Sequence, residues 1–227
     1  MELITFLLRV TAFTLFAVIP TVHATYYDIP YNMTAGETFN VTIKQNIDPN
    51  SENGRATDSY RVYLALTPPG WGTGPVCWLQ YLVPRDQTQV NITIPPDVAP
   101  KGTRIRLSTC LTNSKNGRRV TGFDYSGRTD MSGLNGTWSQ AELDGRSTGD
   151  QDEVSCSAYG CVRDCYDLYY KGDKDDEEYS RKSYACWKAC ARDLNPASAA
   201  SLNVTPVKSL LGVGVMVGFL HLIVGAL

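Results

Sequence analysis

The two histidines of the chain restrict the chemistry it can perform, because both stand near its ends, at His23 and His221. Each lies in a terminal apolar segment that we expect to be removed during maturation. The mature protein would then lack Ser-His-Asp and Cys-His catalysis, imidazole metal ligands and a histidine general base. We therefore expect a non-enzymatic protein with no metal and no cofactor.

Glycoside hydrolysis needs only two carboxylates, so the missing histidines do not exclude it. The densest acidic group falls in a single turn and comprises Asp173, Asp175, Asp176, Glu177 and Glu178. A charged turn of this kind is typical of a solvated loop that caps a helix. It does not fit a calcium loop of the EF-hand type, because Glu178 stands where that loop needs Gly and Tyr184 where it needs Glu.

Four of the seven cysteines form two pairs with helical spacing, Cys161 with Cys165 and Cys186 with Cys190. Residues four apart lie on one helical face, one turn from each other. With the polar turn between the pairs, this spacing predicts an antiparallel helical hairpin over 153–195, held by Cys161–Cys190 and Cys165–Cys186. Such bridges stabilise a small unit with little core in an oxidising compartment. A zinc site is the alternative, but exported thiols normally oxidise.

The remaining three cysteines are Cys77, Cys110 and Cys156. Cys77 and Cys110 both lie in expected strands, so we predict that they form a bridge within the β-structure. Cys156 is then odd: it is free, it joins two chains, or it displaces one of the predicted pairings.

Short strands must position these residues. Apolar and polar residues alternate in Thr38–Lys44, Tyr60–Leu66, Val90–Ile94 and Arg104–Leu111, and a period of two predicts half-buried antiparallel strands. Pro75–Val83 is apolar on both faces and suits a central strand. Several such strands separated by turn residues predict an immunoglobulin-like β-sandwich over 25–145. The side chains expected to face its core are Phe39, Val41, Ile43, Tyr60, Val62, Leu64, Leu66, Val90, Ile92, Ile94, Ile105, Leu107 and Leu111.

Two tryptophans, Trp71 and Trp78, are candidate surface aromatics that could contact a ligand. Trp71 is at the centre of the Pro- and Gly-rich segment Thr67–Pro75, which predicts a loop. An exposed Trp there could stack on a sugar ring. The more ordinary interpretation is that Trp71 folds back over the end of the core.

The N-terminal residues 1–24 have the composition of a secretory signal peptide. An apolar run is followed by Val22 and Ala24, the small residues that favour cleavage after Ala24. An N-terminal membrane anchor is the alternative, but the run is short and is interrupted by Arg9.

The C-terminal residues 196–227 combine small residues, a short polar spacer and an apolar tail that ends at Leu227. This is the pattern of a glycosylphosphatidylinositol (GPI) attachment signal, with Ser198 as the preferred attachment residue. A single-pass helix is the alternative, although such a helix usually carries Lys or Arg on its cytoplasmic side.

Sequons for N-glycosylation also favour export. They are Asn32, Asn40, Asn91 and Asn135, with Asn203 in the segment that we expect to be removed. Asn40 and Asn91 fall on the outward face of their strands, where a glycan fits. The formal net charge of −2 leaves no electrostatic footprint for nucleic acid.

Three pieces of the chain, Ala35–Ile43, Gln89–Pro95 and Val98–Leu107, follow one another as turn, strand and linker. This succession resembles secreted fungal immunoglobulin-like domains over roughly Tyr27–Trp138. One similar group is the necrosis-inducing secreted protein family of plant-associated fungi, whose members are effectors that suppress host receptor-kinase immunity. The other is the Ser/Thr-rich GPI-anchored family related to β-glucan assembly proteins of the fungal wall.

The expected function is that of a GPI-anchored, N-glycosylated protein at the outer face of the plasma membrane or in a fungal cell wall. Its role would be structural or binding, and its partners would be the membrane, through the lipid, and wall polysaccharide or a protein. The alternative is a secreted effector-like protein that binds a host protein through the β-sandwich.

Overall fold

The computed structural model describes residues 25–173 and 175–194, with the side chains of 191–194 excepted. The expected signal peptide, the attachment segment 196–227 and Ser198 lie outside the described residues. Within the described residues, no helix has the length and apolar character needed to cross a membrane.

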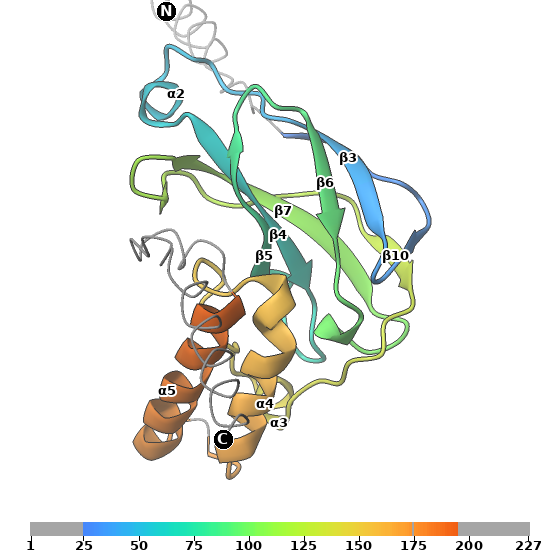
Figure 1. The fold of residues 1–227 in the computed structure, drawn as a ribbon, viewed down its shortest axis with the longest axis vertical. Coiled ribbons are helices and arrows are strands. Elements are labelled where there is room, and N and C mark those ends of the chain that lie inside the picture. Colours follow the sequence, from blue (N-terminus) through green and yellow to red (C-terminus); the bar gives the residue numbers. More distant parts are fainter. Residues whose placement is uncertain (1–24, 174, 195–227) are drawn as a thin grey trace, which may run out of the picture.

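The protein is mainly β, with two sheets (Figure 1). The smaller sheet has the order β1 (Tyr26–Asp28), β3 (Thr38–Lys44), β6 (Gln89–Thr93). The larger sheet has the order β2 (Met33–Thr34), β10 (Thr129–Ser132), β7 (Arg104–Asn113), β4 (Ser59–Leu66), β5 (Gly74–Pro84). The short strands β8 (Arg118–Arg119) and β9 (Asp124–Tyr125) also pair with β7.

Helices occupy the C-terminal part of the described chain and two short connections. The connections contain α2 (Glu52–Ala56) and the 3-10 turn η1 (Pro96–Val98). The C-terminal part contains α3 (Gln140–Leu143), the 3-10 turn η2 (Cys156–Ala158), α4 (Tyr159–Tyr169) and α5 (Glu177–Leu194). Figure 1 shows α3, α4 and α5 together at one end of the sheets.

The core lies between the two sheets and follows the predicted alternation. Val41 and Ile43 from β3, Ile92 from β6, and Leu64 and Leu107 from the larger sheet belong to one buried cluster. Of the predicted core residues only Phe39 is half-buried, where it packs against the edge of this cluster. Burying one such side chain contributes about 1.5–3 kcal/mol, so this cluster is the main stabilising feature of the sheets.

Strand β4 departs from the prediction of a half-buried strand, because all of its residues are buried. On its outer face, Tyr63 forms a second cluster with Trp78 and Cys110, against which Tyr81 and Phe123 pack. Trp78 is 6% exposed, so the prediction that it is a surface aromatic is wrong. Arg61, which the alternation places on the solvent face of β4, is also buried and contacts Tyr81 and Asp152.

The helical hairpin agrees with the prediction. Helices α4 and α5 pack against each other and are joined by Cys161–Cys190 and Cys165–Cys186. The second helix begins where an acidic residue of the turn accepts hydrogen bonds: Asp176 Oδ1 lies 2.8 Å from the amide nitrogen of Glu178. An oxygen acceptor at this position satisfies amides that the helix leaves unpaired.

The predicted Cys77–Cys110 bridge is wrong: Cys77 is bonded to Cys156, and Cys110 is a buried free thiol. The register of the sheet explains the error. On β4, Cys77 is opposite Leu64 and Cys110 is opposite Arg61. Those two partners are three positions apart, so their side chains point to opposite faces, as do the two cysteines. Cys156 therefore displaces one predicted pairing, the third of the alternatives left open for it.

Candidate ligand-binding groove

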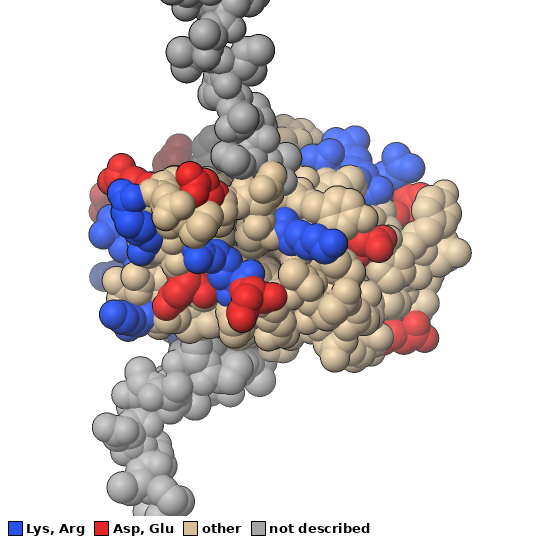
Figure 2. Space-filling model, turned by 90° about the horizontal axis from the view of Figure 1, so that it is seen from above, with Lys and Arg blue, Asp and Glu red and all other residues tan. Residues whose placement is uncertain are grey.

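An open groove runs between the loop from Thr67 to Thr73, the segment 144–151 and helix α5, with a volume of about 1010 Å³. We call it the Trp71 groove and define it by the residues used below: Trp71, Arg146, Ser147, Asp150, Arg181 and Tyr184. It combines aromatic rings with charges of both signs. Figure 2 shows that basic and acidic side chains are also interspersed on the face of the molecule seen from above.

A tight turn positions Trp71. The Trp71 amide donates to the carbonyl of Pro68 at 3.1 Å, and Gly70 between them has φ 84°. Proline after the first residue and glycine at positive φ are the requirements of a type II turn. The hydroxyls of Thr67 and Thr73, 2.7 Å apart, close the loop. The sequence Pro-Pro-Gly-Trp thus fixes where the tryptophan backbone lies.

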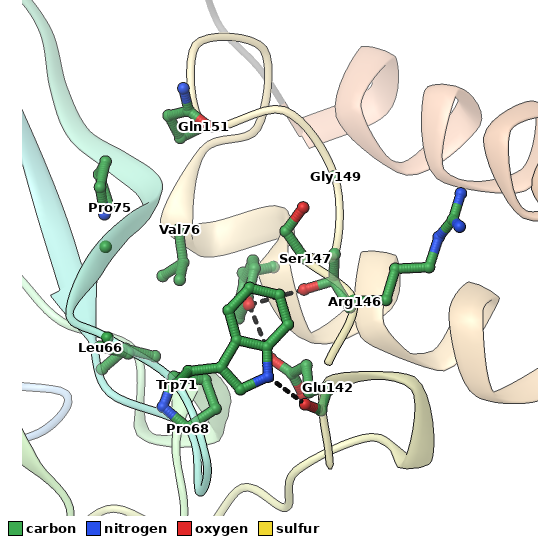
Figure 3. A pocket seen from close by; sticks show the side chains of 14 residues that line it. Leu66, Pro68, Trp71, Pro75, Val76, Glu142, Arg146, Ser147, Gly149 and Gln151 are labelled. Carbon is green, nitrogen blue, oxygen red and sulfur yellow. Dashed lines mark hydrogen bonds between the residues drawn. The ribbon is translucent and has the colours of Figure 1, made fainter. Parts of the chain in front are cut away.

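The indole of Trp71 is held by its polar edge. Its Nε1 donates to the carbonyl oxygen of Glu142 at 2.8 Å (Figure 3), and the ring lies beside Gly145, whose φ of 96° favours glycine. The ring is half-buried. Trp71 is therefore neither fully exposed nor fully buried: its indole is bonded to Glu142 and also lines the groove.

Glu142 anchors the floor beneath Trp71. It ends a capping box, in which the Ser139 hydroxyl accepts from the Glu142 amide and the Glu142 carboxylate accepts from the Ser139 amide. The same carboxylate accepts from Arg163 Nε at 2.9 Å and from the Tyr159 hydroxyl at 2.9 Å. Both charged side chains are almost fully buried. With its hydrogen bonds satisfied, Glu142 is a structural anchor.

Arg163 connects this anchor to the sheets. Its terminal nitrogens donate to the carbonyls of two residues of η1, Asp97 at 2.9 Å and Val98 at 2.7 Å. Burial opposes the charge of Arg163, but the neighbouring Tyr159 and Glu142 outweigh burial and raise the pKa of its guanidinium. Burial also raises the pKa of the Tyr159 hydroxyl, which keeps that group neutral and able to donate.

A second buried arginine, Arg61 on β4, connects the larger sheet to Asp152, in the segment just before η2. Arg61 Nη1 lies 2.7 Å from Asp152 Oδ1, and that oxygen also accepts from the Tyr63 hydroxyl at 2.5 Å. The Tyr63 hydroxyl is 3.3 Å from Cys110 Sγ. Burial is the main cause of the raised pKa of the Cys110 thiol, so this cysteine is an unreactive part of the network.

Helix α5 supplies the far wall of the groove. Tyr184 is 54% exposed and meets the edge of the buried Trp187, with ring centroids 5.2 Å apart. The segment 144–151 forms the facing wall. Its Arg146 reaches α5, where it lies over the ring of Tyr179 and donates to the Ser180 hydroxyl at 2.8 Å. Two aromatic side chains, Trp71 and Tyr184, therefore reach the groove from opposite walls.

A small cavity of about 80 Å³ lies behind Trp71. Its apolar lining comes from the sheet end of the molecule and includes Leu66, Pro75 and Val76. Trp71, Arg146, Ser147 and Gly149 line both the cavity and the groove. The two spaces are therefore adjacent, and the Trp71 side chain lines both of them.

The other predicted site residues lie apart from the groove. The four sequon asparagines, Asn32, Asn40, Asn91 and Asn135, are all exposed. Asn40 and Asn91 are directly opposite across β3 and β6, with Asn40 Nδ2 2.9 Å from Asn91 Oδ1. Within residues 25–173 and 175–194, no group of His, Cys, Asp and Glu is arranged to hold a metal ion.

Sequence reasoning did not identify Glu142, Arg163 or Arg146 as important. One signal was present: Ser139 followed three residues later by Glu142 is the pattern of a capping box and marks the start of a helix. That pattern predicts α3. It does not predict that the glutamate is buried or that Arg163 is its partner.

Comparisons with known proteins identify no family for this chain. No family model matches it, and no curated protein matches it. Among solved structures, a superoxide reductase (neelaredoxin) from Ignicoccus hospitalis aligns with a TM-score of 0.29 and 10% identity, over 48% of this chain and 80% of that chain. A variant of the same reductase aligns with a TM-score of 0.28 and 11% identity. A likeness this weak carries no conclusion about function.

Proposed function

We propose that this chain is a non-catalytic, N-glycosylated protein of a fungal cell surface, held by a GPI anchor at Ser198, that binds wall polysaccharide in the Trp71 groove. The observation that carries the proposal is the placement of Trp71. Its backbone is fixed by a turn, its Nε1 is bonded to Glu142, and its ring still lines an open groove.

The chemistry of the groove suits a neutral carbohydrate. A sugar presents an apolar face of C–H groups and a rim of hydroxyls, so it needs an apolar platform and polar side chains at its edge. Trp71 and Tyr184 offer two platforms, and Arg146, Asp150 and Arg181 offer donors and acceptors around them. The presence of both charge signs in the groove favours a neutral ligand over a strongly charged one.

The strand arrangement supports an immunoglobulin-like assignment for the sandwich. In that fold one sheet contains strands C, F and G, and the other contains A, B and E. The orders β4–β7–β10 and β1–β3–β6 correspond to these sets. Such domains commonly serve as binding modules at cell surfaces. Exposed sequon asparagines on β3 and β6 agree with an exported, glycosylated protein.

Replacing Trp71 with Ala should weaken binding to insoluble wall polysaccharide about thirtyfold, which corresponds to about 2 kcal/mol for an aromatic anchor in a binding site. Trp71→Phe should weaken it less, because the platform remains and only the bond to Glu142 is lost. Binding is measured by depletion of the protein from solution over a polysaccharide titration.

Tyr31→Ala is the matched control, since this aromatic is 85% exposed and is not in the groove. The thermal unfolding temperature of each variant separates lost binding from lost folding. If Trp71→Ala and Tyr31→Ala bind as the parent protein does, the groove is not the polysaccharide site.

A phosphatidylinositol-specific phospholipase should release the native protein from membranes into the soluble fraction, because the proposed anchor is a lipid rather than a helix. Fractions are compared by immunoblot before and after treatment. If the protein is instead already free in the medium, the anchor proposal fails, and the alternative of a secreted protein that binds a host protein becomes the working model. Full retention by the membrane favours a spanning tail.

A further inference from the structure

We infer that the cavity behind Trp71 is a subsite for an acetamido group, so that the groove selects polymers of N-acetylhexosamine over polymers of glucose. This inference rests on the proposed function and names the ligand class of the same site. It is carried by the small cavity with mostly apolar walls that adjoins the polar groove and shares Trp71 with it.

The cavity is suited to a methyl group. Leu66, Pro75 and Val76 supply apolar walls, and a volume of about 80 Å³ admits a small substituent but not a sugar ring. A ring stacked on the groove side of Trp71 could direct one substituent past the indole into this space. The remainder of the polymer would stay in the groove, which is open at the surface.

The buried polar side chains that line the cavity, on Glu142, Thr148 and Tyr159, are already engaged. The Tyr159 hydroxyl donates to Glu142 and is 2.7 Å from the Thr148 hydroxyl, while Glu142 is paired with Arg163. A sugar hydroxyl placed there would lose its water without gaining a strong partner, which is costly. A methyl group incurs no such cost and gains apolar contacts.

Discrimination then follows from the difference between two sugars. Glucose carries a hydroxyl at C2, whereas N-acetylglucosamine carries an acetamido group with a terminal methyl. The cavity therefore favours binding of the methyl group and disfavours binding of the hydroxyl. The amide of the acetamido group would remain at the mouth, where the exposed Ser147 hydroxyl offers both a donor and an acceptor.

The test compares two soluble tetrasaccharides that have the same β-1,4 linkage, one of N-acetylglucosamine and one of glucose, by titration calorimetry with the folded, disulfide-bonded protein. We expect the N-acetylglucosamine tetramer to bind about tenfold or more tightly, the scale of discrimination that one methyl-sized pocket provides. Val76→Phe, which fills the cavity, should lower its affinity to that of the glucose tetramer and leave the glucose tetramer unaffected.

Ser147→Ala is the second variant, since an exposed residue can be changed without affecting folding. It should reduce affinity for the N-acetylglucosamine tetramer more than affinity for the glucose tetramer. Equal affinity of the parent protein for both tetramers overturns the subsite and leaves the polysaccharide proposal standing. Binding of neither tetramer, with no binding to insoluble polysaccharide, overturns both. A preference that survives Val76→Phe in a folded variant places the discrimination elsewhere and also overturns the inference.

Discussion

Replacing Glu142 with Ala should lower the free energy of unfolding by about 3–5 kcal/mol, the usual cost of removing one partner of a buried ion pair. The substitution leaves the Arg163 guanidinium almost fully buried with only the carbonyls of Asp97 and Val98 as acceptors. It also removes the capping box of α3 and the acceptor of the Tyr159 hydroxyl. Unfolding in urea, followed by tryptophan fluorescence, measures the change.

The matched control is Glu178→Ala, which removes an ion pair of similar length on the surface. Glu178 and Lys182 are 2.7 Å apart, one turn from each other on α5, and about half exposed. Water replaces such a partner readily, so the unfolding transition should move little. A double variant, Glu142→Leu with Arg163→Met, should recover much of the loss, because it leaves no unpaired charge buried. Equal effects of Glu142→Ala and Glu178→Ala would show that Glu142 is not buried in solution.

The hydrogen-bond networks of Arg163 and Arg61 explain how the groove keeps a fixed shape. Arg163 joins the helical part to η1 through backbone carbonyls, and Arg61 joins it to β4 through Asp152. The segment 144–151, which forms one wall of the Trp71 groove, lies in the sequence between Glu142, which is paired with Arg163, and Asp152, which is paired with Arg61. A wall fixed at both ends needs little further ordering when a ligand binds, which limits the entropic cost of binding.

Local patterns predicted the elements because each pattern reflects a local cause. The alternation in Thr38–Lys44 and Val90–Ile94 became β3 and β6, since one face of each strand is buried and the other faces water. The spacing of Cys161, Cys165, Cys186 and Cys190 became the two bridges of the hairpin, because positions four apart share a helical face. Neither inference needed long-range information.

The errors concern relations between elements. Whether Cys77 and Cys110 share a face depends on how β5 and β7 are aligned with β4, and a shift of one residue reverses every side chain. Trp78 is buried because a second layer covers the outer face of β4. The partners Glu142 and Arg163 are 21 positions apart in the sequence. These contacts between distant residues depend on the tertiary structure and produce no periodic pattern in the sequence.

Removing the bridge between Cys77 and Cys156 by replacing both with Ala should destabilise the protein by about 4 kcal/mol on the loop-entropy scale. The two cysteines are 79 positions apart and are the only disulfide-bonded pair in the described residues that links the sheet to the helical part. Long closed loops restrict the unfolded chain most, so this bridge should outweigh Cys165–Cys186, which closes 21 positions. Urea unfolding of the oxidised proteins provides the comparison.

Cys110→Ala serves as the control, because it removes a buried sulfur without removing a bridge and should cost much less. The double Ala variant should also bind polysaccharide more weakly. Cys156 begins η2, directly before α4, and the position of the helices determines the shape of the groove. Peptide mapping without reduction identifies the bonded pair independently. A Cys77–Cys110 peptide, or a Cys110→Ala variant as unstable as the double Ala variant, would reverse the assignment of the bridge and with it the attachment of the helices to the sheet.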